Sequence, residues 1–276
     1  MKNNHNNQVI DHYNQVNEKD RLTSSWGQIE FVRTQEIIKQ YLPPTPCTVL
    51  DVGGAAGVYS SWLAEEGHEV HLVDPVPKHI EQAKQISKNQ TKHSISTITV
   101  GDARDLDFPD SSTDAVLLLG PLYHLTKYDD RIQALKEAYR VLKSGGYLFA
   151  VVISRFASCI DGLVSGYYKD KQFQDIVTQD LKNGQHRNHT ENELYFTDAF
   201  FHHPEELRSE ITTVGFHHIA THAIEGISYM LKDFDNKWKS KADREYLLNT
   251  IRFLDTELTL LGASPHIMGV AIKDRS

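Results

Sequence analysis

The chain has 276 residues, of which 39% are hydrophobic and 24% charged, a composition typical of one large domain or of a core domain with insertions. Its net charge of −8, without a dense run of lysine and arginine, disfavours nucleic acid as a partner, because phosphate binding needs a positively charged surface. Two cysteines are too few for a disulfide scaffold, no apolar run approaches the roughly 20 residues of a membrane helix, and the polar N-terminus lacks the apolar core of a secretory signal, so we expect a cytoplasmic protein with no membrane partner.

From residue 46 onward, apolar runs typical of strands alternate with segments of helical periodicity. Strands are predicted over 46–52, 68–74, 95–102, 113–120 and 147–154, and helices over 57–67, 77–87 and 129–146. The run TDAVLLLG at 113–120 is nearly all apolar, which suits a central parallel strand covered on both faces. The alternation predicts an α/β fold with a doubly wound, mostly parallel sheet.

The pattern changes after Ser154, where a polar and aromatic segment begins. Further elements are predicted as a helix over 204–216, a strand over 217–226, helical segments within 227–262 and a last strand over 266–274. We interpret residues 43–276 as a core with cap insertions at 155–203 and 227–262, and residues 1–42 as an N-terminal helical lid. Both would cover the carboxyl edge of the sheet, where open α/β sheets bind their ligands.

Polar or glycine-rich turns follow the first four predicted strands. The first turn carries Asp51 and the small residues Gly53–Gly57, and the next three carry Asp74, Asp102 and Gly120. Small residues let a ligand approach the backbone closely, and the start of a helix presents free N–H groups. An acid that ends the second strand can accept hydrogen bonds from ribose hydroxyls, and an acid on the next strand can accept one from an adenine amino group. The turns therefore predict a nucleotide-binding edge.

The glycine spacing discriminates between cofactors. The dinucleotide pattern G-x-G-x-x-G fails at its last position in either register, where Val58 or Tyr59 stands, and this weakens a dehydrogenase interpretation. The pattern acid-x-G-x-G-x-G fits with one glycine replaced by alanine, at Asp51, Gly53, Ala55 and Gly57. We expect the alanine to be compatible with the turn if its φ angle is negative.

Four stretches in order resemble the successive motifs of class I S-adenosylmethionine (SAM)-dependent methyltransferases. They are VLDVGGAAGVYS, VHLVDPVPKHI, VGDARDLDFPDSSTDAVLLLGPLYHL and ALKEAYRVLKSGGYLFAV. The resemblance covers residues 45–153, and the late helix and strands are similar to the reversed strand pair that closes the family's sheet. It implies a Rossmann-like sheet of seven strands, S-adenosyl-L-methionine as cofactor, S-adenosyl-L-homocysteine as product and no metal.

The resemblance also implies a set of cofactor-binding residues. The glycine turn would contact the amino-acid end of SAM, Asp51 would orient that turn, Asp74 would bind the ribose, and Asp102 would bind the adenine unless it only closes a polar turn. In similar proteins the N-terminal segment folds over SAM, and an arginine there suits its carboxylate, although such arginines could equally be solvated. The full set is Tyr13, Arg21, Arg33, Asp51, Gly53, Gly54, Ala55, Gly57, Asp74, Pro75, Asp102, Ala103, Leu119 and Gly120.

Candidate catalytic residues follow the fourth strand, where the methyl acceptor sits in similar enzymes. His124 is the candidate base, because histidine is the usual base near neutral pH, and Tyr123 lies beside it; alternatively, His124 packs under the next helix. Arg155 could clamp an anionic acceptor or pair with a surface acid, and the cap aromatics could line an acceptor pocket or form the cap core. The candidate substrate-binding set is Tyr123, His124, Arg155, Tyr195, His202 and Tyr229.

These observations predict a SAM-dependent methyltransferase that acts on an O, N or C nucleophile of a small-molecule metabolite. An enclosed pocket and an acidic chain favour a metabolite over tRNA or protein as acceptor. Two alternatives stay open: methylation of a tRNA base, and a SAM-binding sensor or interaction protein without transfer activity.

Overall fold

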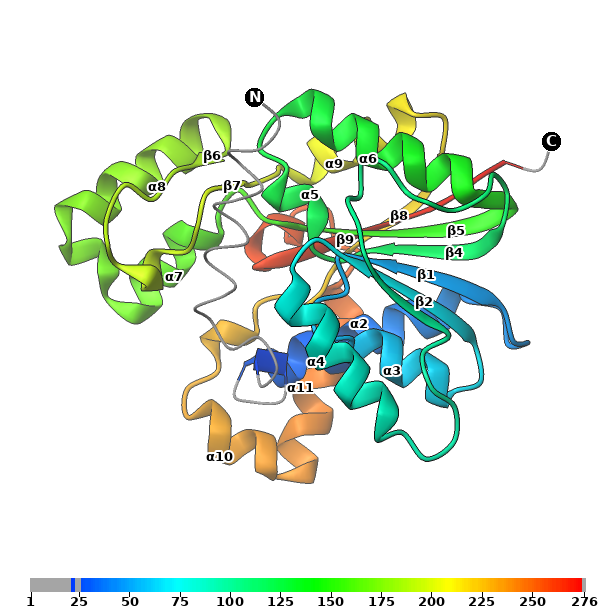
Figure 1. The fold of residues 1–276 in the computed structure, drawn as a ribbon. Coiled ribbons are helices and arrows are strands. Elements are labelled where there is room, and N and C mark those ends of the chain that lie inside the picture. Colours follow the sequence, from blue (N-terminus) through cyan, green and yellow to red (C-terminus); the bar gives the residue numbers. More distant parts are fainter. Residues whose placement is uncertain (1–20, 23–25, 275–276) are drawn as a thin grey trace.

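The computed structural model describes residues 21–22 and 26–274, and its centre is a seven-stranded sheet (Figure 1). The sheet has the order β3-β2-β1-β4-β5-β9-β8. Its strands are β1 (Thr48–Val52), β2 (Glu69–Asp74), β3 (Thr97–Val100), β4 (Thr113–Leu118), β5 (Leu142–Ile153), β8 (His217–Ala223) and β9 (His266–Ile272). β9 runs antiparallel to both of its neighbours, whereas the pairs among β1 to β5 are parallel. The prediction of a doubly wound, mostly parallel sheet of seven strands is confirmed.

Helices cover both faces of the sheet (Figure 1). One face carries α2 (Gly27–Tyr41), α3 (Val58–Glu65) and α4 (Pro77–Lys88), and the other carries α6 (Tyr128–Val141) and α9 (Pro204–Thr213). Alternate side chains of a strand point to opposite faces, so Leu50 and Val116 join the cluster under α6 and α9, while Val49 and Leu117 join the other. Because both faces are buried, the central strands are nearly continuous apolar runs.

The boundary between α6 and β5 differs from the prediction. The segment Lys143–Gly146 was expected to end the helix, but α6 ends at Val141 and β5 begins at Leu142. The register with β4 shifts between Thr113 and Ala115, which makes an irregular strand start. Gly145 donates its N–H to the carbonyl of Lys273 at 2.7 Å, so this stretch is held at the sheet.

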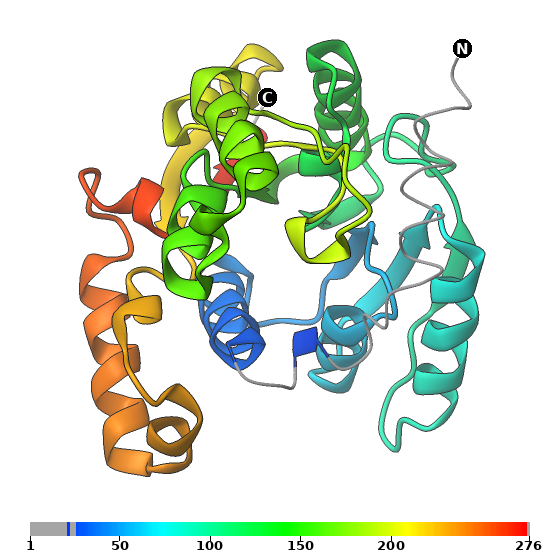
Figure 2. The ribbon, with the colours of Figure 1, turned by 90° about the vertical axis from the view of Figure 1, so that its left-hand side faces the viewer.

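Two of the segments that follow β5 lie outside the sheet, at its carboxyl end (Figures 1 and 2). Residues 155–203, here called the cap, contain α7 (Ala157–Ser165), α8 (Lys171–Asn183) and a short hairpin of β6 (Gln185–His186) and β7 (Ala199–Phe200). The second segment contains α10 (Phe234–Lys239) and α11 (Lys241–Leu254), which pack on Ile29 of α2. None of the described helices is long and apolar enough to cross a membrane.

The N-terminal region that was interpreted as a lid is described only in part. Helix α2 packs Ile37 and Ile38 into the apolar cluster on its face of the sheet, so its second half belongs to the core. Its first half faces the carboxyl edge of the sheet through Glu30 and Thr34. Tyr13 lies outside the described residues, and its predicted contact with the cofactor stays a prediction.

Candidate functional site

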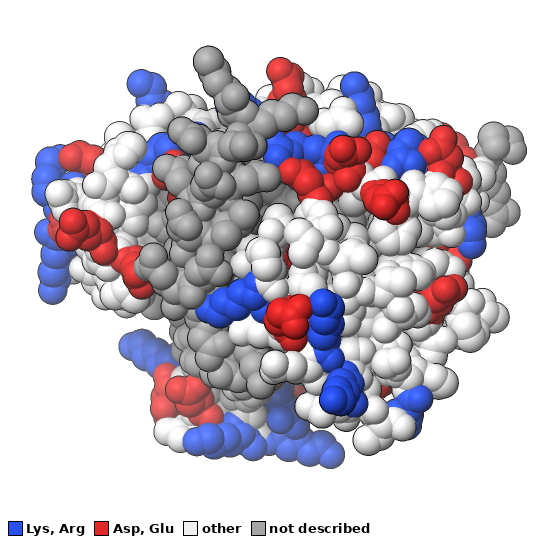
Figure 3. Space-filling view, viewed as in Figure 1, with Lys and Arg blue, Asp and Glu red and all other residues white. Residues whose placement is uncertain are grey.

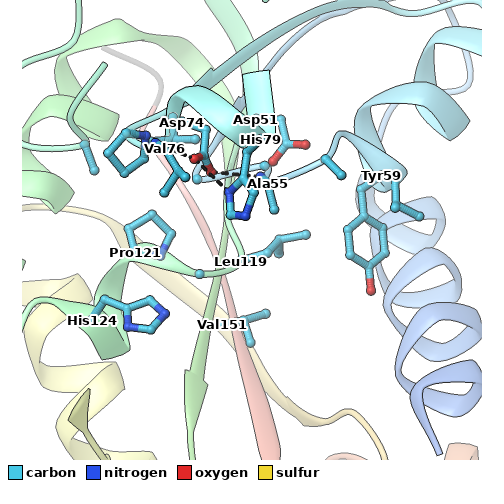
Figure 4. A pocket seen from close by; sticks show the side chains of 18 of the residues that line it. Asp51, Ala55, Tyr59, Asp74, Val76, His79, Leu119, Pro121, His124 and Val151 are labelled. Atoms are coloured by element: carbon cyan, nitrogen blue, oxygen red, sulfur yellow. Dashed lines mark hydrogen bonds and ion pairs between the residues drawn. The ribbon is translucent and has the colours of Figure 1, made fainter. Parts of the chain in front are cut away.

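A pocket lies at the carboxyl ends of β1, β2 and β4, the edge that the sequence predicted (Figure 4). In the close-up, Asp51, Asp74 and His79 lie at one end, His124 and Pro121 along one side, and Tyr59 opposite them. Predicted cofactor residues that line the pocket are Arg21, Asp51, Gly53, Gly54, Ala55, Asp74, Pro75, Asp102, Ala103, Leu119 and Gly120.

The turn after β1 has a backbone that favours glycine at several positions. Gly53 has φ +72°, and a Cβ atom there would lie 2.7 Å from the Pro121 ring, so the turn and the start of α5 (Pro121–His124) touch closely. Ala55 has φ +48°, which corrects the expectation of a negative angle and means that this alanine occupies a strained conformation. Its N–H donates to the Asp74 carboxylate at 2.9 Å, which holds the turn in place.

Gly57 does not line the pocket, contrary to its predicted role in contacting SAM. It caps the N-terminus of α3 with φ +80°, and a Cβ atom there would lie 3.1 Å from Leu72, 3.2 Å from Ala83 and 3.3 Å from Ile95. The last glycine of the motif therefore serves the packing of α3 against β2 and α4, and its predicted contact with SAM stays a prediction.

Asp74 joins the turns that follow β1 and β2. Its side chain is buried, and besides Ala55 it accepts hydrogen bonds from the Val76 N–H at 2.9 Å and the His79 ring at 3.0 Å. Three donors around one carboxylate fix its position in the pocket wall. The carboxylate keeps further acceptor capacity toward a ligand, because two oxygens offer about four lone-pair sites.

Asp51 is a buried carboxylate with one satisfied oxygen. The Ser60 hydroxyl donates to Oδ2 at 2.6 Å, whereas no described residue hydrogen-bonds Oδ1. Burial raises the pKa of Asp51 to about 6, and the negative charge of Asp74 adds to the rise, although the Ser60 hydrogen bonds oppose it. A buried acceptor that lacks a partner at a pocket wall is suited to a positively charged ligand group.

Asp102 and Arg21 complete the charged lining, and both have ion-pair partners. Arg104 donates to the Asp102 carboxylate from its backbone N–H and its guanidinium, which orients the carboxylate at the pocket edge. Arg21 forms a bidentate pair with Glu30 of α2. Although burial opposes ionisation of Glu30, the charges of Arg21 and His266 lower its pKa.

Tyr123 and His124 both line the pocket from α5. Their ring centroids lie 4.6 Å apart, and both side chains are half-buried. The same pocket is also lined by the apolar side chains of Leu119, Leu125, Val151 and Ile224. In the close-up, His124 lies along one side of the pocket, away from the end that holds Asp51 and Asp74 (Figure 4).

Five other predicted residues are not among those that line this pocket, and four of them have a structural partner. Arg33 pairs with Asp255 at 2.6 Å and so connects α2 to the end of α11. The other four come from the predicted substrate set. Arg155 donates hydrogen bonds to Glu206 and to the Phe201 carbonyl, and the Tyr195 hydroxyl donates one to Asp170. His202 lies near Glu210, and Tyr229 lies in a short turn after β8. The interpretation of the aromatic residue Tyr195 as cap core agrees with its burial.

Several pocket residues escaped the sequence analysis. His79 donates to Asp74 from the first turn of α4, and Glu30 and Thr34 are four residues apart on one face of α2. Tyr59 extends into the pocket from α3, and burial raises the pKa of its hydroxyl. Two features of the sequence could have indicated these residues. One is the four-residue spacing of Glu30 and Thr34, and the other is the histidine five positions after Asp74.

The surface seen in Figure 3 carries charges of both signs. Lysine and arginine side chains are interspersed with aspartate and glutamate over the part of this face that the structure describes, without a continuous basic surface. This face therefore lacks the electrostatic pattern typical of nucleic-acid binding.

Comparisons with known proteins agree with the motifs. Residues 50–150 match the family model described as a methyltransferase domain. A 2-methyl-6-phytyl-1,4-hydroquinone methyltransferase of Oryza sativa subsp. japonica is 32% identical over 102 residues, which are 36% of this chain and 27% of that protein. The demethylmenaquinone methyltransferase of Deinococcus radiodurans is 33% identical over 138 residues, which are 49% of this chain and 54% of that protein. The chain thus spans about a quarter to a half of these relatives.

The fold is shared with solved methyltransferase structures. A SAM-dependent methyltransferase of Methanosarcina mazei superposes with a TM-score of 0.61 at 20% identity, covering 87% of this chain and 98% of that one. The predicted resemblance to class I SAM-dependent methyltransferases is confirmed by the match of residues 50–150 to the methyltransferase-domain model, and the solved structure shares the fold.

Proposed function

We propose that this protein transfers a methyl group from S-adenosyl-L-methionine to an O, N or C nucleophile of a small molecule. The observation that carries the proposal is one pocket that joins the acid-rich glycine turn of β1 to His124 of α5. The two relatives described above are named as a 2-methyl-6-phytyl-1,4-hydroquinone methyltransferase and a demethylmenaquinone methyltransferase, which supports a small-molecule acceptor over a macromolecule.

The residues present fit the proposed cofactor. Asp51 Oδ1, buried and unpartnered among the described residues, suits the cofactor's ammonium group, and Arg21 at the pocket wall suits its carboxylate. Asp74 would accept from the ribose hydroxyls, and Asp102 from the adenine amino group. Gly53 and Gly54 leave room for the methionine part beside the backbone.

When bound, S-adenosyl-L-methionine supplies a methyl group that is already activated by a sulfonium. The protein's task is then to align the nucleophile and to exclude water. Leu119, Leu125 and Val151 provide an apolar wall beside His124, which would limit the access of water. For a hydroxyl acceptor, His124 would take the hydroxyl proton and so leave the oxygen as the nucleophile.

Calorimetric titration with SAM, combined with turnover assays on hydroxylated, amine and carbon-acid acceptors, tests the proposal. We expect micromolar binding and turnover on at least one acceptor. Binding without turnover on any acceptor would favour the sensor alternative, and binding of NADH in place of SAM would contradict the proposal.

His124→Gln tests the base within the same assays. Glutamine is similar in size but cannot take the proton, so turnover on a hydroxyl acceptor should fall by about 10²–10⁴-fold while SAM affinity stays nearly unchanged. His189→Gln, at an exposed position of the cap, is the matched control and should retain full turnover. Undiminished turnover of His124→Gln at every pH would exclude His124 as the base.

A further inference from the structure

We propose that His266 and Glu225 are positioning residues for the cofactor, which act through Glu30 and Arg21 on the charge of the pocket wall that faces its amino-acid end. The inference rests on the proposed methyl transfer and adds a dependence of cofactor affinity on the proton of His266. It starts from a network of four charged side chains, here called the charge network. Arg21 and Glu30 line the pocket, whereas Glu225 and His266 are not among its lining residues.

Segments far apart in the sequence contribute to the charge network. Glu30 comes from α2, Glu225 follows β8, and His266 begins β9. The His266 Nδ1 atom lies 2.6 Å from Glu225 Oε1 and 4.0 Å from Glu30 Oε2. Both terminal nitrogens of Arg21 donate to the Glu30 carboxylate. The histidine thus stands between two carboxylates, one of which lines the pocket.

The backbone around the charge network holds its members in place. The His266 N–H donates to Glu225 Oε2 at 3.0 Å, and Ser264 Oγ accepts hydrogen bonds from the N–H groups of Glu225 and Gly226. Glu30 and Glu225 are only 9% and 6% exposed, so water and salt screen their charges weakly. A change of charge on the histidine is therefore felt at the pocket wall.

The charges of the network balance only when His266 is protonated. Glu30 and Glu225 then carry two negative charges, and Arg21 and the histidine carry two positive charges. Burial opposes protonation of His266, but the charges of Glu225 and Glu30 raise its pKa above the usual value, although the charge of Arg21 lowers it. Loss of this proton at higher pH leaves the charge network with one excess negative charge.

The charge network lies beside the part of the pocket assigned to the amino-acid end of the cofactor. Tyr59 of α3 lines the pocket (Figure 4), and the charges of Glu30 and Glu225 add to the rise that burial causes in the pKa of its hydroxyl. The next residue, Ser60, donates to Asp51, the carboxylate proposed to bind the cofactor's ammonium group. The network and the ammonium site thus meet at the start of α3.

The sign of the effect depends on which charged group of the cofactor is closer to the network. Arg21, which suits the cofactor's carboxylate, belongs to the charge network, whereas Asp51 does not. An added negative charge therefore acts mainly on the carboxylate and repels it. We expect the affinity to fall by about 3- to 10-fold when the histidine loses its proton, the scale of one charge several ångströms away in a partly screened site.

Glutamine variants, which keep the approximate size of the side chains, test the inference in calorimetric titrations with S-adenosyl-L-homocysteine. Each variant is compared with the wild type at the same pH, because Asp51 and the ligand also titrate. His266→Gln should bind about 3- to 10-fold more weakly than the wild type at pH 6.5 and equally at pH 9. Glu225→Gln, which removes one negative charge, should bind about 3- to 10-fold more tightly than the wild type at pH 9, a gain that damage to the fold could not produce.

The double variant separates charge from structural support. His266→Gln with Glu225→Gln leaves one carboxylate for one guanidinium, so its affinity at pH 6.5 should return to that of the wild type. A purely structural role would instead add the two losses. The ligand 5′-methylthioadenosine lacks the carboxylate and ammonium groups, so its affinity should be the same in all four proteins at both pH values.

His217→Gln, at an exposed position of β8, is the matched control and should leave every value unchanged. The melting temperature of each variant shows whether its fold is kept. No gain of affinity in Glu225→Gln at pH 9, a double variant weaker than His266→Gln, or equal changes for 5′-methylthioadenosine would overturn the inference and leave methyl transfer standing. Absence of binding of both SAM and S-adenosyl-L-homocysteine to the wild type would instead overturn the proposed function.

Discussion

Replacing Asp51 with asparagine should stabilise the protein and weaken its cofactor binding at the same time. Asp51 is buried, with a pKa raised by burial from 3.8 to about 6, so its ionisation is less favourable in the folded state than in the unfolded state. Because one pKa unit corresponds to about 1.36 kcal/mol, the rise amounts to about 3 kcal/mol of lost stability above pH 6.

The sign of this effect sets the pH window. Below pH 3.8 the carboxyl group is protonated in both states and costs nothing, and the penalty grows as the pH rises from 3.8 to about 6 and then stays constant. Asparagine carries no charge at any pH. The gain in the free energy of unfolding of Asp51→Asn over the wild type should therefore be about 1.5 kcal/mol larger at pH 8 than at pH 5.

Urea denaturation of both proteins at the two pH values measures this difference without the cofactor. Calorimetric titration at pH 7.5 should show SAM bound about 10- to 100-fold more weakly by the variant, the scale of one lost charged hydrogen bond. Asp175→Asn, an exposed carboxylate on α8, is the control and should change neither quantity. An equal gain at pH 5 and pH 8 would refute the buried-charge reasoning, and unchanged affinity would remove Asp51 from the cofactor site.

Three further substitutions test the surroundings of the pocket. Ala55→Gly should raise the free energy of unfolding by about 1 kcal/mol in urea denaturation, because glycine adopts φ +48° without the alanine's strain; a loss of stability would contradict this assignment. Asp74→Ala should weaken SAM binding by about 1–3 kcal/mol in calorimetry, and unchanged affinity would refute the ribose assignment. Arg131→Met should destabilise the protein by about 3–5 kcal/mol, since it leaves Glu210 buried without its bidentate partner. The double variant with Glu210→Leu should recover most of that loss, and purely additive losses would argue against a coupled pair.

The acidic residues of the pocket could be predicted because the carboxyl ends of neighbouring parallel strands lie at one edge of the sheet. Asp51, Asp74 and Asp102 each stand at or just after the end of a predicted strand, and the structure brings all three to one pocket. The spacing of the glycines favoured a resemblance to SAM-dependent methyltransferases over a dinucleotide-binding motif. Within that motif, however, the φ angle of Ala55 and the packing role of Gly57 depend on neighbours that lie elsewhere in the chain.

The partners of the other candidate arginines and aromatic residues could not be predicted in the same way. Arg33 and Arg155 resembled ligand-binding arginines, but each pairs with a carboxylate far along the chain, Asp255 or Glu206. Such ion pairs depend on how distant segments pack against one another, so a local sequence pattern does not predict them. The sequence did not predict a contact between Phe196 and His124, because only the folding of the cap places their rings beside each other.

The sequence by itself determined the fold and predicted the cofactor class, since strand periodicity, helix periodicity and the acid-and-glycine turn are local patterns. Tertiary structure alone decided which charged and aromatic side chains reach the pocket. A buried charge requires a partner. Packing therefore pairs Arg33 with Asp255 and Arg155 with Glu206, and it places His202 near Glu210. Of the candidate acceptor residues, Tyr123 and His124 line the pocket.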